Sequence, residues 1–151
     1  MHRLKSLFLS LFGLILCSSA TVAAPSSDPF VQALNAHWVA SDDAGVTSLI
    51  EKTQKERPKD IVVLVAAYNY YMLIQPDLPK LTEVVQQIKA VSDADGNNTG
   101  LKAFSNRAQT KLTKANAEGI KPVDAEKRAA IHKAFPKEFP GLALGITLQK
   151  P

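Results

Sequence analysis

Residue types that carry acid–base or metal chemistry are sparse in this chain. Beyond position 23 the only histidines are His37 and His132. Neither belongs to a His-x-x-x-His pair, and no serine lies in a Gly-x-Ser-x-Gly elbow. We therefore predict no catalytic residue and no metal site. The alternative is a small envelope enzyme, in which one of these histidines pairs with a carboxylate that folding brings near.

The segment Asp93–Asn97 has oxygen-bearing side chains at alternate positions, as calcium loops do. In the register of a helix–loop–helix calcium site, Asn98 replaces the required glycine and Phe104 replaces the closing acid. The pattern therefore predicts a solvated turn between two helices. Because the chain also has no glycine-rich phosphate loop, we predict no cofactor.

A basic stripe is the strongest candidate for binding. Arg107, Lys111 and Lys114 recur at helical spacing and would share one face, opposite the apolar side of their helix. Lys102 adds charge nearby. Basic residues continue through the C-terminal part at Lys121, Lys127, Arg128, Lys133 and Lys137. We predict a docking surface for an acidic protein segment or an anionic envelope component; the alternative is an ordinary solvated helix face.

Three tyrosines within an apolar run, Tyr68, Tyr70 and Tyr71, form a second candidate. Tyrosine suits binding surfaces because its ring packs while its hydroxyl group forms hydrogen bonds. We predict an apolar groove around these residues that contacts a partner. Burial of the three rings in the core is the alternative.

The N-terminal residues predict an export signal. Arg3 and Lys5 precede the apolar run Leu7–Leu16, and small residues follow it. A basic start, an apolar core and a small-residue exit are the three parts of a secretory signal peptide. The run is shorter than the roughly 20 residues that span a bilayer. We therefore predict a cleaved signal over residues 1–23, no permanent membrane span, and a periplasmic or secreted protein.

Cleavage near Ala23 follows the small-x-small rule, and cleavage after Ala20 fits it as well. Cys17 raises the alternative of lipid attachment, although Leu16 is larger than the residue that lipoprotein signals place before their cysteine. Since Cys17 is the single cysteine, residues 24–151 can form no disulfide bond. This favours a bacterial periplasmic protein over a small extracellular scaffold held by disulfides.

The charge is unevenly distributed along the chain. Residues 28–100 contain ten acids and six bases, whereas residues 101–151 contain ten bases and four acids. Such an uneven charge distribution makes the surface electrically polar, which is a hint about the partners that the protein attracts. We predict no nucleic-acid partner, because the chain has no arginine-rich run and an export signal precedes it.

Apolar periodicity and capping residues predict one domain of five to six antiparallel helices over residues 24–151. The expected helices begin at Asp28-Pro29, at Asp42 or Asp43, at Asp60, at Pro79, near Leu101 and at Asp124. The third, Ile61–Ile74, is apolar enough to be a buried central helix. In the tail, Leu142–Leu148 alternates large apolar residues, which favours a short strand. That strand would lie over the helical core or pair with the sheet edge of a partner.

The segment from Ile61 to Asp95 resembles one tetratricopeptide repeat unit. Its flanking breaks lie about 36 residues apart, near the 34-residue period of that family. Tyr71 takes the aromatic place of the first helix, and Pro76-Asp77 lies at the turn. Tyr68, Leu81 and Ile88 depart from the family, which has small residues there. The resemblance covers about residues 27–98 and implies stacked helix pairs that grip a peptide or protein; a generic helical bundle is the alternative.

These observations predict an exported, non-catalytic protein-binding or adaptor module. A dedicated inhibitor or immunity-type protein that blocks an enzyme fits the same size, charge polarity and lack of catalytic motifs. The sequence does not separate these two functions.

Overall fold

The computed structural model describes residues 28–149, and all regular structure in that range is helical. The predicted signal peptide lies outside these residues. The elements are α1 (Pro29–Val39), α2 (Asp43–Glu56), α3 (Ile61–Asn69), the π-helix η1 (Tyr70–Ile74), α4 (Leu78–Ala94), α5 (Thr99–Glu118), α6 (Ala125–Ala134) and α7 (Leu142–Gln149). The prediction of a small all-α domain is confirmed, with one α-helix more than expected in the described range.

Six of the helices begin at an Asp or Asn whose side chain accepts a hydrogen bond from a backbone N–H of the first turn. These caps are Asp28, Asp42, Asp60, Asp77, Asn98 and Asp124. Each cap satisfies a donor that the start of a helix leaves free. The helix boundaries are therefore encoded locally, and the predicted starts at Asp28, Asp42, Asp60 and Asp124 are confirmed.

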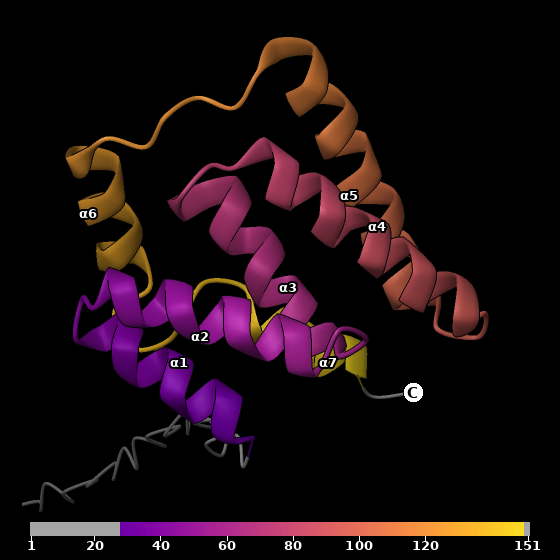
Figure 1. Ribbon diagram of the computed structural model, residues 1–151, viewed down its shortest axis with the longest axis horizontal. Helices are drawn as coiled ribbons and strands as arrows, with labels where there is room; N and C mark the ends of the chain where they lie inside the picture. The colour runs from indigo at the N-terminus through magenta and orange to yellow at the C-terminus, as the bar shows by residue number, and fades with distance from the viewer. Residues whose placement is uncertain (1–27, 150–151) are drawn as a thin grey trace, which may run out of the picture.

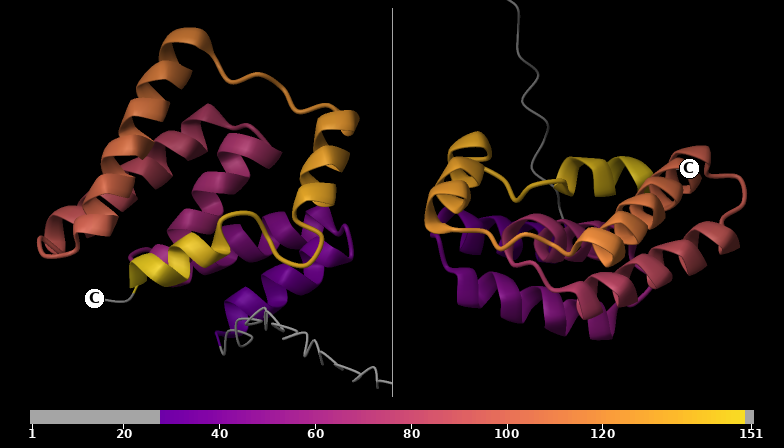
Figure 2. Two further views of the ribbon diagram at one scale, coloured as in Figure 1. Left: turned by 180° about the vertical axis from the view of Figure 1, so that it is seen from behind. Right: turned by 90° about the horizontal axis from the view of Figure 1, so that it is seen from above.

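The helices form three layers. Seen from above (Figure 2, right), α2 and α4 lie on one side, α1, α3 and α5 in the middle, and α6 and α7 on the other side. Successive helices of the first five run side by side in pairs, α1 with α2, α3 with α4, and α4 with α5 (Figure 1). Within the middle layer, α3 is thus covered from both sides, by α2 and α4 on one and by α7 on the other.

The centre of the core is α3, in which every residue from Ile61 to Tyr68 is buried. A helix that is apolar on all faces is stable only when neighbours cover all of them, and α2, α4 and α7 do so here. The prediction of a buried central helix over Ile61–Ile74 is confirmed for α3. Its last turns widen into η1, where the Gln75 backbone N–H donates to the Tyr70 carbonyl.

One arginine joins two of the helix caps. The Arg57 guanidinium donates to both oxygens of Asp28, at 3.1 and 2.8 Å, and through Nε to Asp60 Oδ2 at 3.0 Å. Asp28 caps α1 and Asp60 caps α3, so Arg57 at the end of α2 fixes the starts of both helices. These ion pairs lower the pKa of Asp28, chiefly through the hydrogen bond from Arg57, and raise the pKa of Arg57.

The predicted C-terminal strand is wrong, because residues Leu142–Gln149 form the helix α7. Leu142, Gly145 and Leu148 are buried against the core, while Leu144 is 38% exposed. Three-residue spacing of the buried positions is the helical period, which the alternating leucines concealed. Gly145 permits close approach, since a Cβ there would lie 3.1 Å from the Val62 Cα of α3.

The helix α6 lies at the edge of the molecule, with one end near α1 and α2, and none of its residues is fully buried (Figure 1). Trp38 of α1 holds its C-terminal end: the Trp38 indole N–H donates to the Phe135 carbonyl at 2.8 Å. The Trp38 ring stacks on His132 with a centroid distance of 3.7 Å and meets the buried Phe139 edge-on at 5.3 Å. Ala129 and Ala130 of α6 are exposed.

Candidate binding site

The basic residues of α5 border its buried side. Phe104, Ala108 and Ala115 are buried, whereas Lys111 and Lys114 are exposed. At about 100° per residue, Lys111 lies only about 40° around the helix from Ala115. The expectation that the basic stripe lies opposite the apolar side is therefore wrong. The two lysines line the same groove as Ala115.

This groove has a volume of about 340 Å³ and lies where the end of α5, the segment 119–121 and η1 meet. We call it the α5 groove. Its lining combines the apolar side chains of Met72, Ala115 and Ile120 with the charged side chains of Lys111, Lys114, Glu118 and Lys121, and includes Gly119. Three lysines against one glutamate make it a basic groove with an apolar floor.

Gly119 directs the chain out of α5 and along the groove. Its φ of 75° lies in the region that side chains disfavour, and no atom lies within 4 Å of a Cβ added there. Glycine is therefore required at this position by the backbone angle, as is common at the end of a helix. The turn places Ile120 and Lys121 beside the last turns of α5.

The acid of the groove neutralises its lysines only weakly. Lys114 Nζ lies 3.8 Å from Glu118 Oε2, and both side chains are about two-thirds exposed. Exposed pairs at this distance contribute little, about 0.3–0.5 kcal/mol on a helix. Within residues 28–149, neither Lys111 nor Lys121 forms an ion pair. The lysines are thus available to an anionic ligand.

The structure brings only part of the predicted basic stripe to this groove. Arg107 is exposed on the same side of α5 but does not line the groove. Lys102 and Lys111 are about two and a half helical turns apart, so they lie on opposite sides of α5. Sequence reasoning noted Lys121 only as added charge and missed Met72 and Ile120. Helical spacing on α5 could not indicate Met72, because its contact joins segments distant in the sequence.

The predicted surface groove around the three tyrosines is wrong. Tyr68, Tyr70 and Tyr71 are 9%, 1% and 2% exposed and belong to the core. The reason is that α3 and η1 are enclosed by neighbouring helices, so their aromatic rings pack inside. Tyr68 meets Phe104 edge-on at 5.5 Å, which joins α3 to α5. Burial raises the pKa of all three phenols, that of Tyr71 to about 12.

A second depression, of about 290 Å³, lies between α2 and α4 with Tyr71 in its lining. Paired side chains cross it. Lys80 of α4 binds Glu51 of α2, and Gln87 accepts a hydrogen bond from Gln54 at 2.8 Å. Because these side chains are already paired with one another, we interpret the depression as a polar contact between α2 and α4 rather than as a binding site.

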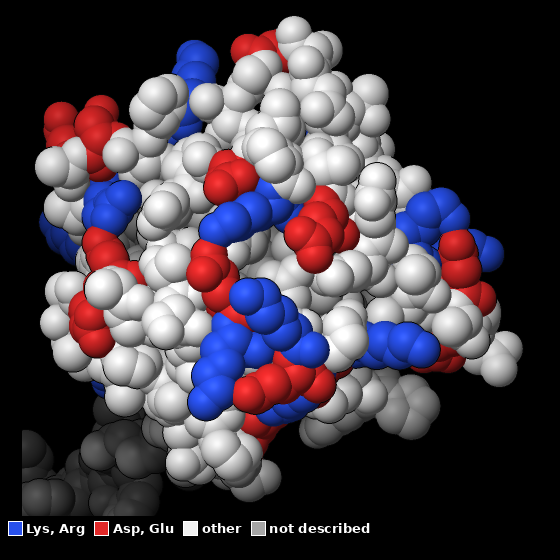
Figure 3. Space-filling model, in the orientation of Figure 1, with Lys and Arg blue, Asp and Glu red and all other residues white. Residues whose placement is uncertain are grey.

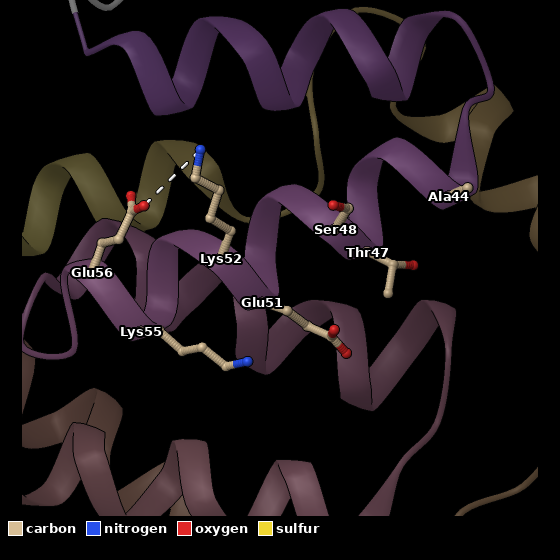
Figure 4. Close-up of a pocket in the computed structure, with 7 residues that line it drawn as sticks. All are labelled: Ala44, Thr47, Ser48, Glu51, Lys52, Lys55 and Glu56. Carbon is tan, nitrogen blue, oxygen red and sulfur yellow. Dashed lines mark ion pairs between the residues drawn. The ribbon is translucent and has the colours of Figure 1, made fainter.

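The outer face of α2 carries a third, shallow depression. Figure 4 shows its side chains in two rows, with Lys52 pointing toward α1 and Glu51 and Lys55 pointing toward α4. Lys52 pairs with Glu56 across one turn at 4.0 Å. On this side of the molecule, basic and acidic side chains are intermixed over α2 and α4 (Figure 3). The mixture gives this face no single charge for a partner to recognise.

His37 forms a pair with a carboxylate: Nδ1 lies 2.7 Å from Asp42 Oδ2. The same carboxylate caps α2 by accepting from the Gly45 N–H at 2.9 Å, and this bond and His37 lower the pKa of Asp42. A Cβ at Gly45 would overlap both side chains, so the glycine makes room for the pair. His37 lines none of the three depressions. The arrangement supports the turn between α1 and α2.

The turn between α4 and α5 is shorter than predicted: Asp93 and Ala94 still belong to α4, and residues 95–98 connect the two helices. Asp93 pairs with Lys89 one turn earlier on α4. In residues 28–149, no group of three or more histidine, cysteine, aspartate or glutamate side chains is placed to hold a metal ion. Among the same residues, no helix combines the length and apolarity that crossing a membrane requires.

Comparison of the chain with protein-family models, with curated proteins and with solved structures gives no match. The resemblance to tetratricopeptide repeats therefore stays a prediction.

Proposed function

We propose that this protein is an exported, non-catalytic protein-binding module that holds an acidic segment of its partner in the α5 groove. The observation that carries the proposal is the convergence of Lys111, Lys114 and Lys121 around the apolar floor made by Met72 and Ile120. Lysines attract carboxylates, and the apolar floor accepts an aliphatic side chain placed between them. A groove of this size suits a short segment with acidic residues on either side of an apolar one.

The place of action follows from residues 1–23. Their basic start, apolar core and small-residue exit support export to the periplasm or secreted space. The tetratricopeptide-like pattern of residues 27–98, if it reflects the architecture, would provide the scaffold for such a binding module.

The test uses residues 24–151 and two synthetic peptides, one with a leucine flanked by glutamates and one in which glutamines replace the glutamates. We expect only the glutamate peptide to bind, with an affinity that falls as salt rises, because screening weakens exposed charge pairs. Reversal of the groove lysines, Lys111→Glu, Lys114→Glu and Lys121→Glu together, should abolish binding. The control reverses Lys102, Lys133 and Lys137, which changes the net charge equally but leaves the groove intact. Equal loss in both triple variants would show only general attraction to a basic protein.

An adaptor and an inhibitor use such a groove in the same way. The two functions can be distinguished by an experiment in which the wild-type protein captures a partner from envelope extract and the activity of that partner is assayed. Loss of activity supports the inhibitor. Unchanged activity, with capture lost in the groove variant, supports the adaptor.

The His37–Asp42 pair is the observation that favours a small envelope enzyme instead. The two side chains are 39% and 45% exposed, so the pair is open to solvent. Hydrolysis of a model ester by the purified protein, lost in His37→Ala but not in His132→Ala, would support that alternative. We expect no such activity, because the Asp42 carboxylate also caps α2.

A further inference from the structure

The α5 groove is connected to α6 through the chain itself. The segment 119–124 leaves α5, contributes Gly119, Ile120 and Lys121 to the groove, and ends at Asp124, the cap of α6. Figure 1 shows this segment arching from α5 to α6. Residues 122–124 thus link α6 to one wall of the groove, in which Ile120 also packs on the core.

A small set of contacts holds α6 in place. His132 stacks on Trp38 with an interplanar angle of 11°, and Arg128 forms an ion pair with Asp43 of α2. The Phe135 carbonyl accepts from the Trp38 indole. No residue of α6 is fully buried, and its apolar contact with the core is the partly buried Ile131, so apolar packing contributes little to its docking. Elements with few buried contacts are the ones that open locally while the rest of the fold stays intact.

The chain beyond α6 is anchored firmly. Phe139 is fully buried against Trp38, and its N–H donates to Asn35 Oδ1 at 2.8 Å. The residues between Phe135 and Phe139 therefore form the hinge. If α6 is released, its N-terminal end and the attached segment 119–124 are the parts that swing.

Arg128 also contacts the end of η1, the element that carries Met72 into the groove. Besides Asp43, its guanidinium reaches the Ile74 carbonyl at 3.4 Å. Ile74 is the last residue of η1. One side chain thus ties α6 to both α2 and η1, and through them to the groove.

We propose that α6 is a latch, fastened by His132 on Trp38 and by Arg128 on Asp43, whose docking sets the shape of the α5 groove. With α6 docked, Ile120 and Lys121 are held beside α5 and the groove is ready for its ligand. With α6 released, that wall is held only by the packing of Ile120 on the core and loosens. Occupation of the groove and docking of α6 therefore favour each other, as linkage requires. The ligand part of this inference rests on the proposed function; the latch itself does not.

The latch can be tested without a ligand. Trp38 is the single tryptophan of the chain, so its fluorescence reports on the stack with His132. The test variant is His132→Ala with Arg128→Met, and the control is Lys133→Ala with Lys127→Met, two exposed positions on the same helix. We expect the test variant to shift Trp38 emission and to speed amide exchange in α6 by about tenfold. The reason is that the variant loses the stack on Trp38 and the ion pair with Asp43. Exchange in α3 and α4 should not change.

Equal exchange of α6 in the test variant and the control would overturn the latch. Faster exchange throughout the molecule would also overturn it, because α6 would then be part of one cooperative fold.

The coupling is tested with the glutamate–leucine peptide. We expect the peptide to slow exchange of α6 in the wild type and to bind about threefold or more weakly to the test variant, since fewer molecules hold the groove ready. Neither substituted residue lines the groove. Binding of equal strength to both variants, with α6 exchange unaffected by the peptide, would overturn the coupling. Absence of binding to the wild type would overturn the proposed function, and the latch would then be decided by the exchange of α6 alone.

Discussion

Tyr70 and Tyr71 meet edge to face with their ring centroids 5.3 Å apart, yet only the Tyr70 hydroxyl has hydrogen-bond partners within residues 28–149. Tyr70 bonds Thr47 of α2 and donates to Gln75 Oε1 at 2.6 Å. The Tyr71 hydroxyl is buried without a partner in that range. A buried polar group costs free energy unless it is hydrogen-bonded.

The two tyrosines should therefore respond oppositely to loss of the hydroxyl. Tyr70→Phe removes the hydroxyl group that bonds Thr47 and Gln75, so each of these residues loses a hydrogen bond. The substitution should lower the free energy of unfolding by about 1–2 kcal/mol. Tyr71→Phe removes an unsatisfied group and should leave that free energy unchanged or raise it by up to about 1 kcal/mol. Urea denaturation of both variants measures the difference, and each is the control for the other. A loss at Tyr71 as large as at Tyr70 would contradict the prediction.

The ion pair of Asp28 with Arg57 predicts a pH dependence of stability. The pKa of Asp28 lies below its usual 3.8, so its contribution is complete above that pH. The contribution is lost as pH falls through the lowered pKa, because the folded state must then bind a proton that the unfolded state already holds. Asp28→Asn should therefore cost about 1 kcal/mol at neutral pH. The difference between variant and wild type should shrink toward zero as the pH falls from about 4 to 2.

Thermal unfolding at a series of pH values measures this difference. Asp95→Asn, which changes an exposed carboxyl on the turn after α4, is the matched control. If the Asp28→Asn difference stayed constant down to pH 2, the ion pair would not be its cause.

Local signals made the first six helices predictable. A capping Asp or Asn and the apolar period lie within one stretch of sequence, so the starts at Asp28, Asp42, Asp60 and Asp124 needed no knowledge of the fold. The tail was different. Leu142, Leu144 and Leu148 fit a strand by alternation, and only the packing of Gly145 on Val62 reveals which positions face the core. That information lies in α3, about eighty positions earlier.

The candidate site was predictable only in part for the same reason. Lys111 and Lys114 were found because helical spacing is a local property. Ile120 follows the end of α5, and Met72 comes from η1, so the apolar floor exists only after the chain has folded. The tyrosine groove failed because a sequence of apolar residues does not show how many neighbours will cover it.

The identity of α7 as a helix predicts different roles for two of its leucines. In a strand, Leu144 and Leu148 would share a face; in α7, Leu144 is 38% exposed and Leu148 is 6% exposed. Leu148→Ala should therefore lower the free energy of unfolding by about 2 kcal/mol or more, and Leu144→Ala by less than about 0.5 kcal/mol. Urea denaturation compares the two. Equal losses would support the extended tail instead.

A substitution at Gly145 tests how closely α7 packs on α3. A methyl group there would approach the Val62 Cα to 3.1 Å, and backbone yields less readily than a side chain. Overpacking costs about 1–3 kcal/mol, against a gain of up to about 1 kcal/mol from the better helix propensity of alanine. Gly145→Ala should thus be destabilising by about 1 kcal/mol or more and should speed amide exchange in α7. The control is Gly96→Ala, where no atom lies within 4 Å of the added Cβ, and it should leave stability unchanged or slightly higher. A stabilising effect of Gly145→Ala would mean that α7 does not pack this closely on α3.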